Sequence, residues 1–505
     1  MPPRFPALAL VLAFVAAPLH ARDTEPLTRD DVGWLGRVGF GVDSATVARY
    51  RELGRRRFLD EQLQPGNTAL PADVRAQLDS FEAIHTPLPT LVSQYRDEAK
   101  RIREMPAGDD QVAAKKALQQ SGNDLARQAQ SAELLQAIYG EDQLREQMVW
   151  FWLNHFSVFA NKGRVRWLAG DYAENTIRPH ALGKFRDLVM ATLKSPAMLE
   201  FLDNAQNARG HVNENYAREL MELHTLGVGS GYSQQDVQQL ALILTGVGVD
   251  FDDAPRKLKP EWQALYVREG VFEFNPARHD FSDKVLLGTK IPGGGFDEVE
   301  KAVDLIVKQP ACATFVSTQL ARYFVGDKPP PTLIEHMAKT FRRSDGDIAA
   351  VLKTLFTSRE LADSYGKKFK DPTQFLVSSM RLAYDGAPIA NPKPLVNWIN
   401  ALGQAPFGRL TPDGWPLDDA SWSSSGQLSR RFEIARSIGN GTNRLFDLDD
   451  GGKRQRPGFP QLASRTYYDA VEPFLGTKTR EGLAKAISVQ EWNTFLLASP
   501  DFNYR

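Results

Sequence analysis

The feature that most constrains the fold is the spacing of apolar residues, which is helical along most of the chain and almost never alternates as in a strand. Segments such as 91–103 and 124–139 combine Ala, Gln, Leu and charged residues at helical spacing. Helix-capping patterns recur, for example Ser233 followed three residues later by Asp236. We therefore predict an all-α (mainly α) fold.

Two regions depart from this pattern. Residues 250–295 hold Gly, Pro and Asp turn signals with short Phe and Val runs, typical of one small β-hairpin or a lid. Residues 386–462 are rich in Gly, Pro, Asp and Ser, and loops this long usually carry function. The sequence has no repeat with a period of 20–50 residues, so it does not predict a solenoid. We expect one large multi-helix globular body over residues 22–505, with long irregular loops and core motifs at about 141–290.

The N-terminus has the pattern of a secretory signal. One basic residue, Arg4, precedes an apolar run from Phe5 to Ala17, which is too short to span a bilayer comfortably. We predict a signal peptide at residues 1–21, cleaved after Ala21, and a periplasmic or secreted location. The alternative is an uncleaved membrane anchor. No later segment suits a membrane span, so we expect a soluble protein with no stable membrane span after signal removal.

Charge and cysteine content exclude several classes of function. The net charge is -1 at pH 7, which gives no electrostatic footprint for nucleic acid. Cys312 is the only cysteine, so an internal disulfide and a Cys-based metal cluster are excluded. No nucleotide or haem motif is present, and GxSxG and HExxH are absent. The cofactor is therefore unknown, and a divalent metal is the one weakly supported option.

The densest group of polar residues is NENYARELMELHTLG, at residues 213–227, which we predict to be helical. Glu214, Arg218 and Glu222 have i,i+4 spacing and are placed to form ion pairs. Glu219 and Glu222 share one face, and two carboxylates there suit acid/base catalysis or metal binding. Surface ion pairs alone explain the same spacing.

The residues before and within this stretch favour a functional polar site. The polar side chains that crowd the junction are Asp203, Asn204, Asn207, Asn213 and Asn215. Amide side chains are poor helix formers, and here they outnumber what helix caps require. We predict that this group, together with Glu214 and Arg218, binds a polar substrate.

Two further candidates lie elsewhere in the chain. Asn154 and His155 end a Trp- and Phe-rich helix that should be buried, and a buried imidazole must be hydrogen-bonded. A satisfied core histidine explains this pattern; if it meets the carboxylates, His155 becomes a general acid/base and Asn154 a substrate contact. His279 and Lys284, in NPARHDFSDKVLLG, suit a loop that reaches a cleft, although a surface turn explains them equally.

These motifs together resemble one protein family. WFWLNHFSV, AMLEFLDNAQN, NENYARELMELHTLGVGSGYSQQDV and RHDFSDKVLLG are similar to the bacterial family catalogued as "domain of unknown function 1800", over about Gly33 to Phe502. The resemblance implies an exported protein, often encoded beside a sulfatase-like exported companion, with no known reaction. His224 stands where relatives often carry Phe, which favours His155 over His224 as a catalytic residue.

Three hypotheses follow. The first is an exported hydrolase-like enzyme that acts on a polar, carbohydrate-type substrate and uses Glu219, Glu222 and His155 in catalysis. The second is a non-catalytic helical scaffold or binding protein that works with an exported sulfatase-like partner. The third is a divalent-metal protein that uses the same three side chains.

Overall fold

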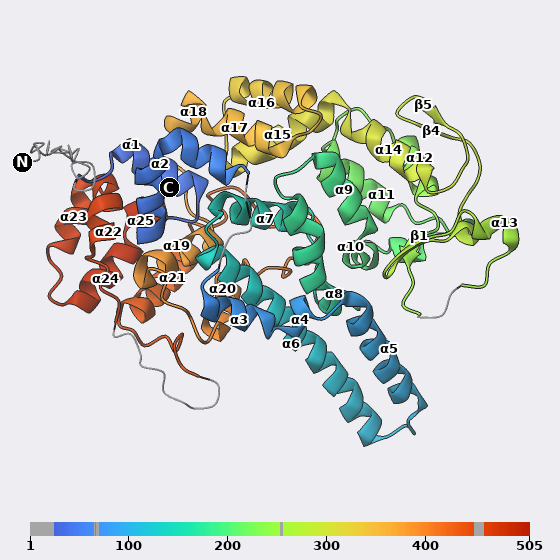
Figure 1. Ribbon diagram of the computed structural model, residues 1–505, viewed down its shortest axis with the longest axis horizontal. Helices are drawn as coiled ribbons and strands as arrows, with labels where there is room; N and C mark the ends of the chain where they lie inside the picture. Colours follow the sequence, from blue (N-terminus) through green and yellow to red (C-terminus); the bar gives the residue numbers. More distant parts are fainter. Residues whose placement is uncertain (1–24, 65, 67–69, 253–255, 449–458) are drawn as a thin grey trace, which may run out of the picture.

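The computed structural model describes residues 25–64, 66, 70–252, 256–448 and 459–505 (Figure 1). This described part contains 25 α-helices and two small antiparallel sheets, which confirms the prediction of a mainly α fold. The expected signal peptide at residues 1–21 lies outside the described residues. None of the described helices combines the length and the apolar content that a membrane span requires.

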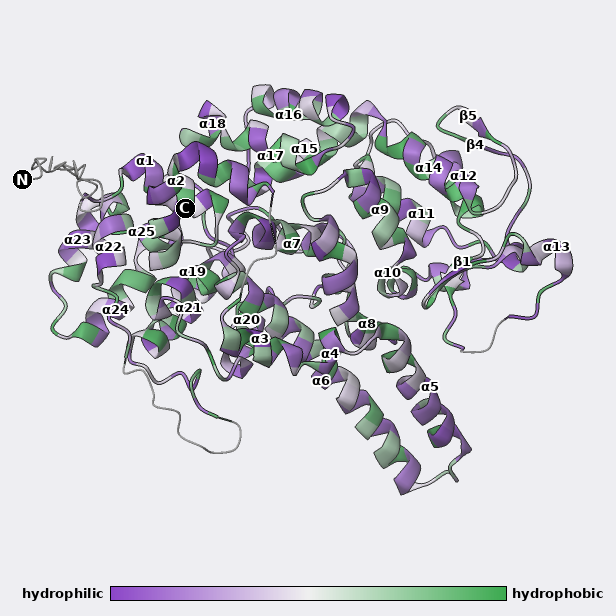
Figure 2. Ribbon diagram, in the orientation of Figure 1, coloured by the Kyte–Doolittle hydropathy of each residue, from purple (hydrophilic) through white to green (hydrophobic). Residues whose placement is uncertain are grey.

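The N-terminal helices include a long hydrophilic arm. They are α1 (Arg29–Val38), α2 (Ser44–Gln62), α3 (Ala72–Asp79), α4 (Glu82–His85), α5 (Leu88–Glu104) and α6 (Asp109–Tyr139). A bend divides α2 at Gly54, where φ is 70° and ψ is 162°, a conformation that glycine adopts readily. The paired helices α5 and α6 form the arm, which projects from the body (Figure 1), and α5 is predominantly hydrophilic (Figure 2).

The core helix is α7 (Gln143–His155). Its residues Met148, Val149 and Trp152 are buried, as the apolar sequence predicted. Asn154 and His155 are only partly buried, which differs from the full burial expected from the sequence, because α7 ends at the edge of a cleft. The buried hydrophobic residues around α7 belong to a cluster that runs through the sequence from Trp34 to Phe502.

The polar stretch at residues 213–227 forms a helix that changes type along its length. The elements of this region are α8 (Val165–Asp171), the π-helix η1 (Tyr172–Ile177), η2 (Arg178–His180), α9 (Phe185–Lys194), α10 (Pro196–Phe201), η3 (Asn204–Gln206), α11 (Asn215–Glu219), the π-helix η4 (Leu220–Thr225) and α12 (Gln234–Ile243). The amide of Leu226 donates to Met221 O at 2.9 Å, five residues back, as in a π-helix. Gly227 then ends the helix with a φ of 87°.

Two small sheets occupy the region where one hairpin was expected. Its elements are β1 (Val247–Val249), α13 (Pro260–Gln263), β2 (Val267–Glu269), β3 (Phe272–Phe274), η5 (Pro276–Arg278), β4 (Lys284–Leu286) and β5 (Thr289–Ile291). The first sheet has the order β1-β3-β2, with Phe274 opposite both Val247 and Val267, and the second pairs β4 with β5. Strands of three residues are too short to show alternation in a sequence.

The C-terminal helices close the body against its N-terminal end. They are α14 (Asp297–Val307), α15 (Pro310–Phe324), α16 (Pro331–Arg343), α17 (Ile348–Phe356), α18 (Arg359–Ala362), α19 (Pro372–Tyr384), α20 (Lys393–Ala401), α21 (Ser425–Gly439), α22 (Arg465–Ala470), η6 (Glu472–Phe474), α23 (Thr477–Leu483), α24 (Val489–Ala498) and α25 (Pro500–Asn503). Helix α22 lies beside α2 (Figure 1). The backbone carbonyl of Asp469 accepts from Leu27 N at 2.8 Å, and its side chain pairs with Arg51 at 2.9 Å.

Candidate functional site

An open cleft of about 430 Å³ lies where α7 ends, between η4, α15 and the loop at residues 413–418. Its polar lining side chains are Asn154, His155, Glu222, Gln319, Arg322, Asp413 and Asp418. The fold therefore brings His155 and Glu222 together from separate parts of the sequence. We refer to this feature as the cleft.

His155 enters the cleft as a neutral imidazole. Its Nε2 lies 2.9 Å from His224 O, and because a carbonyl can only accept, Nε2 carries the proton and Nδ1 keeps a lone pair. Burial lowers the pKa of His155 to about 4, and the hydrogen bond to His224 only partly opposes this shift. His155 can accordingly accept a hydrogen bond at Nδ1 near neutral pH, where the ring stays neutral.

Glu222 lines the cleft from the π-helical turn of η4. Arg218 Nη2 lies 3.0 Å from Glu214, and Arg218 Nη1 lies 3.5 Å from Glu222, so both predicted i,i+4 contacts form. Gln234 also accepts from Arg218, at 2.9 Å. Because these side chains are about one-third exposed, each such pair contributes only about 0.3–0.5 kcal/mol. Glu222 has the looser contact and the position facing the cleft.

Two neighbouring carboxyl groups have pKa values shifted in opposite directions. Burial raises the pKa of Glu219, the charges of Glu222 and Asp413 raise it further, and Arg218 opposes them. Burial would also raise the pKa of Asp413, but hydrogen bonds from Arg409 and Thr411 hold it below its usual range. A carboxyl with a raised pKa beside one with a lowered pKa is an arrangement that acid/base catalysis uses.

Asn154 fixes the loop that carries Asp413. Its Nδ2 donates to Trp415 O at 3.0 Å, and its Oδ1 accepts from Trp415 N at 2.6 Å. Gly414 has a φ of 71°, and a Cβ there would lie 2.2 Å from Asn154 O. Both ends of the Asn154 amide are thus engaged in holding the loop against α7. Asn154 lies in the cleft, but its contacts are with the protein.

The buried asparagines hold a different junction. Asn204 donates to Val247 O at 2.8 Å and accepts from Asn207 Nδ2 at 3.2 Å. Asn207 also donates to Ala241 O at 2.9 Å. Both side chains are buried, and they connect the turn after α10 to α12 and β1. They do not line the cleft.

The remaining polar residues of this junction also lie outside the cleft. Asn213 Oδ1 accepts from Asn215 N at 2.9 Å, and Asn215 Nδ2 donates to Leu202 O at 3.1 Å. Asp203 pairs with Lys162 at 2.8 Å and lines a separate groove. The crowding seen in the sequence therefore reflects a hydrogen-bonded turn that leads into α11.

His279 and Lys284 form a sealed ionic network. Glu298 accepts from His279 Nε2 at 3.0 Å and pairs with Lys284 Nζ at 2.7 Å, and all three side chains are 0% exposed. Burial would raise the pKa of Glu298, but these two partners and Gly294 N lower it below its usual range. The network ties β4 to α14 and does not reach the cleft.

Several residues of the cleft were not identified from the sequence. Gln319 and Arg322 stand one turn apart on α15, where they interrupt apolar side chains, and Asp413 lies in a loop rich in Gly and Pro. The polar pair on an apolar helix was a usable signal; for Asp413 there was none. Among the described residues, no three His, Cys, Asp or Glu side chains are placed to share a metal ion.

Comparison with known proteins identifies one family. A family described as "Protein of unknown function (DUF1800)" matches residues 33–504. No curated protein and no solved structure matches the chain.

Proposed function

This chain belongs to the DUF1800 family, and from that premise we propose that it is an exported hydrolase that cleaves a polar, carbohydrate-type substrate in the cleft. One observation carries the proposal: His155, Glu222, Asp413 and Arg322 converge from four separate elements on an open, water-accessible cleft. Convergent polar groups with perturbed proton affinity are typical of active sites.

The carboxyl groups divide the acid and base roles. Glu219 lies outside the lining of the cleft but is coupled by charge to Glu222 and Asp413, which line it. Its pKa is raised, so we assign it the role of donating the proton to the leaving oxygen. Glu222 accepts a proton from the attacking water, whose oxygen forms the new bond to the sugar carbon as the glycosidic bond breaks. One water is consumed for each bond cleaved, and the next proton transfer with solvent restores both carboxyl groups.

The other polar groups orient the substrate. Nδ1 of His155 accepts a hydrogen bond from a substrate hydroxyl. Arg322 and Gln319 supply donors from α15. Asn154 acts through the loop that it holds rather than on the substrate.

The test compares three carboxylate variants in a screen of soluble polysaccharides, with release of reducing ends as the readout. Glu219→Gln and Glu222→Gln should each lower kcat by at least about 100-fold. Glu433→Gln is the matched control, because Glu433 is exposed on α21 and pairs only with Arg436 among the described contacts. Equal activity in all three variants would remove Glu219 and Glu222 from the mechanism.

The pH profile adds a sharper criterion. The basic limb of kcat should report the loss of the Glu219 proton. Because the charge of Glu222 raises the pKa of Glu219, the residual activity of Glu222→Gln should show this limb at lower pH. An unmoved limb would contradict the assignment of Glu219 as the acid.

The proposal includes export, which the N-terminal sequence pattern and the family resemblance support. It also includes a sulfatase-like companion, which the family resemblance implies. A purified protein that cleaves no polysaccharide but captures its exported companion would favour the scaffold alternative. Retention of divalent metal by the purified protein would instead favour the metal alternative.

A further inference from the structure

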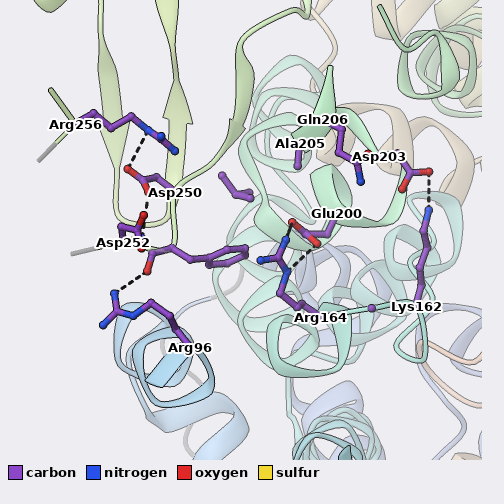
Figure 3. A pocket seen from close by; sticks show the side chains of 13 residues that line it. Arg96, Lys162, Arg164, Glu200, Asp203, Ala205, Gln206, Asp250, Asp252 and Arg256 are labelled. Atoms are coloured by element: carbon purple, nitrogen blue, oxygen red, sulfur yellow. Dashed lines mark hydrogen bonds and ion pairs between the residues drawn. The ribbon is translucent and has the colours of Figure 1, made fainter. Parts of the chain in front are cut away.

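A long groove runs between the arm and the body, separate from the cleft. It consists of two neighbouring chambers of about 580 Å³ and 750 Å³. Arg96, Gly163, Arg164, Glu200 and Phe251 line both chambers, so the two are continuous. The larger is the arm-side chamber, against α5 and α6. The smaller is the inner chamber, beside β1 (Figure 3).

The arm-side chamber concentrates positive charge. Its cationic lining residues are Arg96, Arg103, Lys115, Arg164 and Arg166, and among its described lining residues only Glu200 is a carboxylate. Glu200 pairs with Arg164 at 2.8 Å (Figure 3). Arg166 donates only to neutral groups, Asn123 Oδ1 at 2.8 Å and Asn161 O at 3.1 Å. The chain as a whole has a net charge of -1, so this excess is local.

Aromatic rings stand beside these cations. Tyr95 and Trp167 are partly exposed, with ring centroids 4.7 Å apart. Phe251 lines both chambers, and the guanidinium of Arg164 lies over its ring at 4.2 Å. Partly exposed rings in a groove offer flat apolar surfaces on which the faces of sugar rings or bases can stack.

The inner chamber has mixed charge, which discriminates between these ligands. Lys162 pairs with Asp203 at 2.8 Å, Asp250 pairs with Arg256 at 3.3 Å, and Asp252 also lines the chamber (Figure 3). These carboxylates repel a polymer that carries a phosphate on every unit. Hydroxyl groups, in contrast, donate to carboxylates and accept from Lys and Arg.

We propose that the groove binds an acidic glycan, a sugar chain whose carboxylate or sulfate groups occupy the arm-side chamber while hydroxyl-bearing units extend into the inner chamber. The juxtaposition of clustered cations, exposed rings and a mixed-charge extension carries this inference. It concerns binding alone, so it holds whether or not the cleft cleaves the chain.

Close helix packing at the floor of the groove fixes the positions of Arg166 and Trp167. Arg166 and Trp167 lie on α8, directly against α6 at Gly122, where a Cβ would meet Arg166 Cδ and Trp167 Cζ2 at 2.5 Å. Gly170 allows the other side of α8 to approach α4, where a Cβ would lie 2.0 Å from Ala83 O. The two glycines therefore let α8 sit between α4 and α6, with Arg166 and Trp167 facing the groove.

Binding is measured by fluorescence anisotropy with a labelled hyaluronan oligosaccharide, which carries a carboxylate on alternate sugars, and with lightly sulfated dextran of similar length. Neutral dextran and single-stranded DNA are the comparison ligands. At least one acidic glycan should bind, with an affinity that falls as salt rises, and the better of the two identifies the charged group that the groove prefers.

The variant Arg103→Gln/Lys115→Gln removes two exposed cations of the groove and should weaken binding about tenfold. Arg101→Gln/Lys116→Gln is the matched control, since it removes the same charge from the same two helices at positions outside the groove. Control binding should equal that of the wild type.

The proposal is overturned by no binding of either acidic glycan, by equal binding by the two double variants, or by tighter binding of DNA than of both glycans. Glu219→Gln and Glu222→Gln should bind the glycans as the wild type does. Loss of binding in those variants would place the glycan in the cleft and would contradict the proposed site in the groove. If the wild type binds the glycans but does not cleave them, only the proposed hydrolase activity is contradicted.

Discussion

Burial keeps the imidazole of His155 neutral. The stability of the folded protein should therefore depend on pH in the acid range. The folded-state pKa of His155, about 4, lies below the usual value of about 6.5. As pH falls through this window, the unfolded chain takes up a proton before the folded protein does, so the free energy of unfolding should fall between about pH 6.5 and pH 4.

This prediction can be checked with urea unfolding across that pH range. His155→Asn should lose part of the acid dependence because Asn does not titrate. His85→Asn, at an exposed position on α4, should leave the dependence unchanged. Identical pH dependence in the wild type and His155→Asn would contradict the assigned pKa.

Lys284 shows the cost of breaking a buried ionic network. Lys284→Met leaves the Glu298 carboxylate buried with His279 and without its cation, so we expect a loss of about 3–5 kcal/mol in unfolding free energy. The measurement is chemical denaturation. Lys301→Met, which removes a cation from an exposed pair with Asp297 on the same helix, should change stability little. Similar losses of unfolding free energy in the two variants would contradict the large cost expected for breaking the buried network.

At the scale of elements, the loop at 413–418 depends on one glycine. Gly414→Ala places a Cβ 2.2 Å from Asn154 O at a residue whose φ is 71°, so the loop must shift away from α7. Gly386→Ala is the control, because Gly386 also has a positive φ (83°) but no atom near its Cβ position.

Both substitutions carry a backbone cost of about 1–3 kcal/mol, and only Gly414→Ala adds the clash. We expect Gly414→Ala to be the less stable protein by thermal unfolding and, if the cleft has the proposed hydrolase activity, the only one of the two in which that activity falls. Equal stability would indicate that the loop relaxes without disturbing α7.

Local signals determined how far the elements could be predicted. The capping box of Ser233 and Asp236 acts through neighbouring residues, so the sequence alone located it. Local spacing gave no indication of the π-helical turn at 220–225. It also did not show that 109–139 is one helix, because Gly122 suggests a break where α8 in fact packs closely.

At the scale of the whole molecule, the candidate site combines features that follow from local helix geometry with features that depend on tertiary packing. The i,i+4 contacts of Arg218 followed from helix geometry. The approach of His155 to Glu222 depends on tertiary packing between distant segments, and so does the arrival of Asp413 from the C-terminal loop. Polar crowding at 203–215 was misleading in one respect: the amides of Asn204 and Asn207 are engaged within the fold.

Export can be tested on the intact chain. If the signal is cleaved after Ala21, the mature protein should begin at Arg22 and appear in the periplasm or the medium. N-terminal sequencing of the protein recovered from each cell fraction checks this. A membrane-bound product that retains Met1 would instead support the uncleaved anchor.

The arm has a consequence for exchange of backbone amides with deuterium. Helix α6 has 31 residues, about 47 Å of helix, and its buried residues begin only at Gly122. Amides near its exposed start should therefore exchange through local fraying, while those of its buried half should need much larger openings. This gradient provides an internal ruler: a ligand that bridges α6 and the body should slow exchange mainly in the outer turns, and so reveal occupancy of the groove without any label.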